Sequence, residues 1–208
     1  MGGQSGDRAQ GRNHEARVLR RHLPARVLVA RRHTRGQSVS SEDEKTTAIG
    51  LLEREWHQLD TWLRSLSEAQ LDRPVFSAGP GWRVRDMPTH MAWWQELAGR
   101  VAEKIAAEGG APDERGSRPF LGIDTPFDEL NATTHETWRE RPMKDRWDRW
   151  LVAHSRMIDA FRALSPDQLL QGEGGLEGLK RYFAVPALIH LRSHRQNIEA
   201  ALKETTTT

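Results

Sequence analysis

Two histidines that stand four residues apart are the first side chains in this sequence with an obvious chemical use. They are His190 and His194, in the stretch ALIHLRSHRQNIEAAL, residues 187–202. At about 100° per residue, both fall in the apolar arc that contains Leu191 and Ile198, so a helix here turns its imidazoles inward. Imidazoles one turn apart form a metal-chelating pair. The alternative is that each ring bonds a carboxylate, a carbonyl or buried water.

A third histidine strengthens the metal interpretation. His90 lies in GWRVRDMPTHMAWW, residues 81–94, in or beside the apolar stripe of Val84, Met87 and Trp94. Three imidazoles from two helices supply three ligands and leave one position open, as in catalytic zinc sites. Imidazole also suits nickel, iron and copper. The residue types leave the divalent metal open, and zinc or nickel is our expectation.

Three further candidates have positions that fit either chemistry or packing. His154 shares the apolar side of a predicted helix with Leu151 and Ile158. It is expected to act as an acid or base in the pocket, or else to be a core histidine with its hydrogen bonds satisfied. Trp82 and Trp94 are expected to wall an apolar ligand pocket, or else to pack in the core.

Three polar residues complete the set of candidates. Asp86 is expected either to cap the second helix or to orient a histidine through a hydrogen bond. Asn131 and His135 precede Trp138 in the sequence. They are expected either near the mouth of the pocket or on the surface.

Four stretches with apolar residues at spacings of three and four must position these side chains. They run from about 42 to 66, 84 to 108, 127 to 164 and 186 to 203. Pro142 divides the third stretch. Ser41 and Glu44 fit a capping box at the start of the first, and Pro186 fits the first turn of the last.

These stretches predict an all-α protein, a four-helix bundle with a long connection between helices 2 and 3 at residues 109–126. No segment shows strand alternation of useful length. The hexamers LSEAQL, residues 66–71, and LSPDQL, residues 164–169, end the first and third helices. Their likeness suggests a duplicated helix pair.

Composition excludes several classes of function. The 208 residues include no cysteine, which excludes disulfides, thiolate metal ligands and a cysteine nucleophile. No apolar run reaches the roughly 20 residues of a membrane span, so no membrane partner is expected. Residues 1–37 carry a net charge of +7 and the remainder −5, so the folded part is not expected to bind nucleic acid.

The basic charge belongs to an arginine-rich N-terminal arm, residues 1–40, which we expect to be disordered. We also expect a short disordered tail at residues 205–208. Three interpretations of the arm compete: a targeting peptide, a basic arm for anionic partners, and unstructured sequence upstream of a misassigned start near Val39. We favour the third, because the arm lacks the continuous apolar stretch and cleavage site of a secretory signal. The domain then spans residues 41–204.

The segment GWRVRDMPTHMAWW, followed about a hundred residues later by HLRSHRQNI, resembles the DinB-like superfamily. The members of that superfamily are four-helix bundles with a histidine triad that binds a metal. The resemblance spans about residues 41–203 and implies the ligands His90, His190 and His194, with Arg195 after the last ligand as a cofactor-binding residue. Residues 128–147, DELNATTHETWRERPMKDRW, are similar to the ClbS/DfsB branch of the superfamily, which often lacks the triad.

The resemblance implies two alternative functions. The first is a metal-dependent enzyme that acts on a reactive small molecule, such as an S-transferase or isomerase that uses mycothiol or bacillithiol. The thiol would come from outside, because the chain has no cysteine. The second is a ClbS/DfsB-like protein that binds a small molecule for self-protection without metal catalysis. The resemblance also implies a homodimer, and we expect the protein to be cytoplasmic. Whether the protein is an enzyme is left open between these alternatives.

Overall fold

The computed structural model describes residues 40–75, 81–113, 116–171 and 176–203. Within these residues the chain is helical, and pairing of extended chain is limited to two isolated bridges. The expected N-terminal arm, apart from Ser40, and the C-terminal tail lie outside the described residues. No helix in the described part is both long enough and apolar enough to span a membrane.

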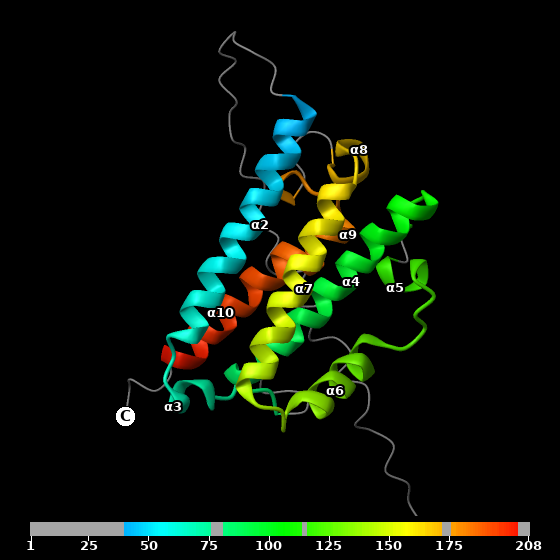
Figure 1. Ribbon diagram of the computed structural model, residues 1–208. Helices are drawn as coiled ribbons and strands as arrows, with labels where there is room; N and C mark the ends of the chain where they lie inside the picture. Colours follow the sequence, from blue (N-terminus) through cyan, green and yellow to red (C-terminus); the bar gives the residue numbers. More distant parts are fainter. Residues whose placement is uncertain (1–39, 76–80, 114–115, 172–175, 204–208) are drawn as a thin grey trace, which may run out of the picture. The chain divides into compact units, whose positions relative to one another are not determined.

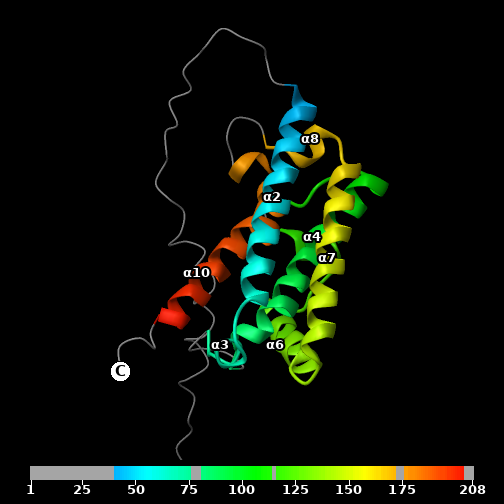
Figure 2. The ribbon, with the colours of Figure 1, turned by 60° about the vertical axis from the view of Figure 1, so that its left-hand side comes forward.

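Four long helices form the bundle, as predicted (Figure 1). They are α2 (Ser41–Arg64), α4 (Met87–Glu108), α7 (Met143–Ala163) and α10 (His190–Lys203). A short 3-10 turn, η2 (Val84–Asp86), leads into α4, while α9 (Arg181–Ala184) and the π-helix η4 (Val185–Ile189) lead into α10. Figure 2 shows α10 inclined to the other three long helices.

Helices α4 and α7 run in the same direction. Arg149 pairs with Glu96 at 2.9 Å, and Arg156 pairs with Glu103 at 3.0 Å, so the second pair lies seven residues further along both helices. Two parallel helices need a connection that returns along the bundle. The long segment between them does this, and it carries α5 (Ser117–Phe120) and α6 (Phe127–Trp138) (Figure 1).

The two halves of the bundle repeat one local pattern. The similar hexamers form α3 (Glu68–Leu71) and α8 (Pro166–Leu169), and each begins with a serine and glutamine capping box and ends in a buried leucine. An isolated bridge follows each of them, Pro74 with Arg83 and Leu170 with Leu179. The likeness of the hexamers therefore reflects the same turn between an antiparallel pair of helices.

The start of α2 differs by one residue from the prediction. Ser40, not Ser41, is the cap: its Oγ accepts a hydrogen bond from the backbone N–H of Asp43 at 3.2 Å, and the Asp43 carboxylate accepts from Ser40 in return. The motif of serine followed three residues later by an acid fits both registers, because Glu44 stands three residues after Ser41.

The last helical segment begins earlier than predicted. It starts at Arg181, so Pro186 lies inside it and not in its first turn. Proline lacks an N–H and crowds the carbonyl four residues before it. The wider π-turn of η4 accommodates both effects. Because α10 itself is regular, the predicted angular relation between His190 and His194 is unaffected.

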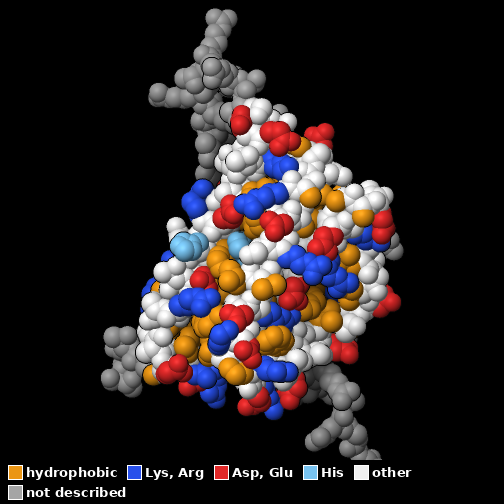
Figure 3. Space-filling view, viewed as in Figure 1, with side chains coloured by type: hydrophobic (Ala, Val, Ile, Leu, Met, Phe, Trp, Pro, Cys, Tyr) orange, Lys and Arg blue, Asp and Glu red, His pale blue; other side chains and the backbone are white. Residues whose placement is uncertain are grey.

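The apolar core has two parts, which are separated along the helices by a layer that contains polar side chains. One part contains Leu52, Ile105, Phe161 and Phe183; the other contains Trp56, Trp82, Met87, Trp150 and Leu191. Between them along the helices lie Gln95, His154 and His190, all buried. On the face shown in Figure 3, basic and acidic side chains are interspersed, with no continuous basic area of the kind that binds nucleic acid.

Candidate metal centre

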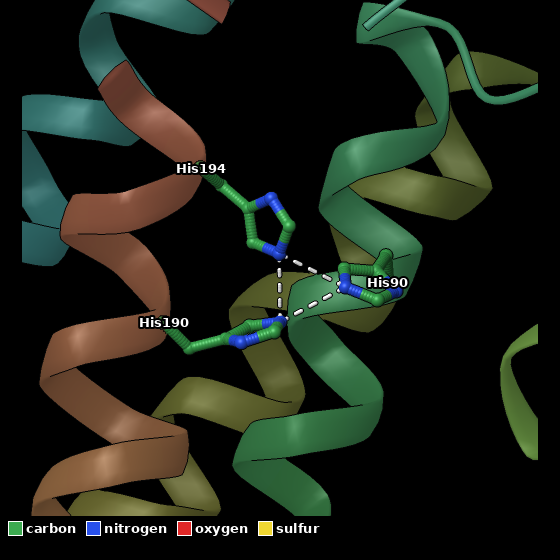
Figure 4. A group of neighbouring side chains, drawn as sticks. All are labelled: His90, His190 and His194. Carbon is green, nitrogen blue, oxygen red and sulfur yellow. Dashed lines mark hydrogen bonds between the residues drawn. The ribbon is translucent and has the colours of Figure 1, made fainter. Parts of the chain in front are cut away.

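Three histidines converge in the interior between α4 and α10 (Figure 4). The Nε2 atom of His90 lies 2.9 Å from that of His190 and 3.0 Å from that of His194. The Nε2 atoms of His190 and His194 lie 2.8 Å apart. All three side chains are at most 8% exposed. The structure thus brings together the three histidines that the sequence singled out.

Hydrogen bonds alone cannot satisfy this triangle. A neutral imidazole presents either a hydrogen or a lone pair at Nε2. Among three such atoms at least two are alike, so at least one of the three contacts sets two hydrogens or two lone pairs against each other. A cation resolves the conflict, because it accepts all three lone pairs at once.

Burial keeps the three rings neutral, as metal ligands must be. Burial, and then the charge of His194, lowers the pKa of His90 well below the ordinary 6.5. Burial, and then the charges of His194 and His90, lowers the pKa of His190 likewise. Burial lowers the pKa of His194 to about 4. At neutral pH each ring therefore carries a lone pair for an ion and no charge that would repel it.

The separations fit a single transition-metal ion. Nitrogens at about 2.0–2.1 Å from zinc, in tetrahedral arrangement, lie roughly 3.3 Å from one another. The observed separations of 2.8–3.0 Å are within about half an ångström of that value. Among the described residues these three form a candidate metal-binding group. Which ion they would hold does not follow from the donor set.

Aromatic rings enclose the triad. The Trp82 ring meets His90 edge-on with ring centres 4.9 Å apart, and Trp94 lies 4.5 Å from His190. Phe127 from α6 stacks on Trp94 at 4.8 Å. The two tryptophans predicted to wall a ligand pocket therefore lie in contact with the proposed ligands, and both are buried.

A buried ionic network lies beside Trp82. The Asp86 carboxylate accepts a hydrogen bond from Arg146 at 2.8 Å and lies 3.5 Å from Nε2 of His135. It makes no capping bond to α4. Asp86 therefore neither caps α4 nor contacts the triad; its hydrogen bonds come from Arg146 and from the backbone N–H of Arg83. The sequence reasoning missed Arg146, although its place four residues before Trp150 on the apolar stripe of α7 was a signal.

Two other candidates lie against neighbours outside the triad. His154 stacks on Trp56 with ring centres 4.3 Å apart, and burial, assisted by Arg162, lowers its pKa to about 4. Arg195 pairs with Glu199 at 3.0 Å and lies over the ring of Trp62. Their roles in catalysis and cofactor binding stay predictions.

Comparison with known proteins places the chain in a family. Residues 52–198, more than half of the chain, match the family model of the mycothiol maleylpyruvate isomerase N-terminal domain. No curated protein and no solved structure matches. The match contains all three histidines of the triad and both tryptophans beside it. The chain therefore belongs to the mycothiol maleylpyruvate isomerase N-terminal domain family, a DinB-like family.

Proposed function

We propose that this protein is a metal-dependent enzyme that uses a low-molecular-weight thiol, of the mycothiol or bacillithiol kind, on a small electrophile. The observation that carries the proposal is the buried triangle of Nε2 atoms from His90, His190 and His194. The family match supports the choice of thiol, because the family is described by its mycothiol-dependent isomerase. S-transfer and isomerisation are both compatible with the arrangement.

The residues of the chain have distinct parts in this proposal. The three neutral histidines hold one divalent ion by their lone pairs, and Trp82 and Trp94 shield two of these rings from water. A divalent ion held there stabilises the anionic form of a bound thiol or water. The nucleophilic sulfur comes from solution, because the sequence contains no cysteine.

Elemental analysis tests the metal. Untagged protein purified without chelator is expected to contain about one divalent ion per chain, zinc or nickel. The protein is then loaded with cobalt and titrated with thiols. A thiolate-to-cobalt absorption band is the expected result. Protein that is metal-free and does not take up cobalt would contradict the proposal and favour the ClbS/DfsB-like alternative of binding without a metal.

A further inference from the structure

The ring of His90 has a second nitrogen whose hydrogen lacks a conventional acceptor. A neutral imidazole that offers a lone pair at Nε2 carries its hydrogen on Nδ1. Nε2 of His90 faces the triangle, so Nδ1 lies on the side of the ring away from it (Figure 4). This Nδ1 atom is buried, and within the described part of the chain it has no hydrogen-bond partner. Histidines that bind metals ordinarily donate this hydrogen to a carboxylate, a carbonyl or water, which fixes the orientation of the ring.

The indole ring of Trp82 packs against His90 from outside the triad. The ring centres lie 4.9 Å apart and the planes cross at 68°, so one ring presents its edge to the face of the other. Trp94 contacts His90 from a greater distance, 6.4 Å. The face of an aromatic ring is negative and accepts the hydrogen of an N–H group, as a weaker substitute for an oxygen acceptor. Trp82 is buried, so little water competes for that face.

Both the backbone and the side chain of Trp82 are held in place. The backbone N–H of Val75 donates to the Trp82 carbonyl at 3.0 Å. The indole meets the ring of His135 with centres 4.7 Å apart and planes crossing at 60°. His135 in turn lies 3.5 Å from the Asp86 carboxylate, which accepts a hydrogen bond from Arg146 at 2.8 Å. The indole therefore has a supported orientation in the core.

We propose that Trp82 positions His90 for metal binding, because its indole face accepts the Nδ1 hydrogen of that ring. This contact fixes the tautomer that leaves the lone pair on Nε2, and it fixes the rotation of the imidazole. The inference rests on the proposed metal centre and adds a contribution from α7, since Arg146 lies at the base of the support. Trp82 acts through His90 and is not itself a ligand.

Two substitutions separate the aromatic face of Trp82 from its bulk. Trp82→Phe keeps an aromatic face, whereas Trp82→Leu fills part of the same space without one. The affinity for cobalt is measured by titration against a competing chelator, and circular dichroism checks that each variant is folded. Trp82→Leu should weaken cobalt binding about tenfold or more, as loss of the outer partner of a metal-binding histidine does. Trp82→Phe should stay within about threefold of wild type, because a face remains.

Proton NMR gives a second measurement that needs no substitution. In zinc-loaded wild type with labelled histidine, the Nδ1 hydrogen of His90 should resonate upfield of those of the other two ligands, because an indole face shields a proton above it. It should also show nuclear Overhauser contacts to the Trp82 ring. An unshielded hydrogen without those contacts would overturn the proposal, whatever the variants show.

Trp150→Leu is the matched control, because Trp150 is a buried tryptophan of the same apolar cluster whose ring contacts are with Trp56 and Trp147. It should leave the cobalt affinity unchanged. Equal weakening in the Trp82→Phe and Trp82→Leu variants, or weakening in neither, would overturn the role of Trp82 while leaving the proposed metal centre in place. So would equal weakening in Trp82→Leu and Trp150→Leu. A wild type that takes up no cobalt would overturn both.

Discussion

His90 is the donor that joins two helices, since His190 and His194 both belong to α10. Two imidazoles hold a transition-metal ion far less well than three. His90→Ala should therefore reduce the metal from about one per chain to less than roughly a tenth after dialysis, measured by elemental analysis. His154→Ala, which removes a buried histidine stacked on Trp56, should retain the metal. Full metal content in the His90 variant would contradict the triad.

At the scale of single residues, the sequence predicted what depends on local spacing and missed what depends on distant partners. The convergence of His190 and His194 could be predicted because α10 is a regular helix, in which residues four apart share one face. The contact of Asp86 with Arg146 joins residues 60 apart in the chain, and nothing in either local pattern selects the other. Asn131 and His135 fitted the surface as well as a pocket mouth, because polar residues are ordinarily exposed, but the structure buries both.

Among the helices, α4 packs closely against α7 at Gly99. A Cβ there would lie 3.4 Å from the backbone of Met157. Gly99→Ala should therefore change the free energy of unfolding by less than about 1 kcal/mol, since gained helix propensity offsets the tight contact. Gly99→Val should cost about 2 kcal/mol or more, because its branches have no space.

The control for this prediction is Gly50→Val in α2. There the neighbour of an added Cβ is the flexible end of Arg54, at 3.6 Å. Denaturant titration should find that variant within about 0.5 kcal/mol of wild type. Similar destabilisation of the Gly50 and Gly99 variants would show that the loss does not come from the contact between α4 and α7.

The cap of α2 gives a second prediction for a helix. Ser40→Ala should lower the free energy of unfolding by about 1 kcal/mol, because it exposes the N–H of Asp43 and removes the capping box. Ser41→Ala should leave the stability nearly unchanged. Chemical denaturation measures both. A greater loss in the Ser41 variant would restore the register that the sequence pattern alone suggested.

The positions of the four long helices were predictable, but their ends were not. Apolar spacing locates the middle of a helix. Its first residue depends on which of two adjacent serines accepts the capping hydrogen bond, and spacing does not decide that. The π-turn before His190 has no such spacing signal, because Pro186 is equally suited to a first turn. The sequence predicted a long connection between α4 and α7, but their parallel direction is known only from the ion pairs between them.

For the whole molecule, buried histidines make stability depend on pH. The pKa of His154 and of His194 is lowered to about 4, and those of His90 and His190 lie well below 6.5. In the unfolded chain these pKa values return to about 6.5, so below that pH the unfolded state binds more protons. The metal-free protein should therefore keep its full stability above pH 6.5 and lose it as the pH falls toward 4.

Urea titration at several pH values measures this loss, which approaches about 1.4 kcal/mol per pH unit for each histidine. The variant His154→Leu has one such group fewer and should lose less stability over the same interval. A free energy of unfolding that is constant between pH 6.5 and 4 would contradict the neutral, buried state of these rings.

Assembly as a homodimer stays a proposal drawn from the resemblance. The exposed large apolar side chains of the described residues are Leu151 and Val152 on α7, at 47% and 64% exposure. Light scattering should report a dimer, and Val152→Asp should shift it toward monomer if this part of α7 is the contact. A wild-type protein that is monomeric at working concentration would refute the proposal.

The ligands of the candidate centre lie far apart along the chain, because His90 and His190 are separated by 100 positions. An ion held by both would cross-link the chain at these two positions and close the segment between them into a loop. Pulled from its two ends in an optical trap, the protein could lengthen only outside this closed segment until the ion dissociates. The sudden release would then approach about 330–360 Å of contour length. Force would thus report occupancy of the centre molecule by molecule, without reference to any chemical reaction.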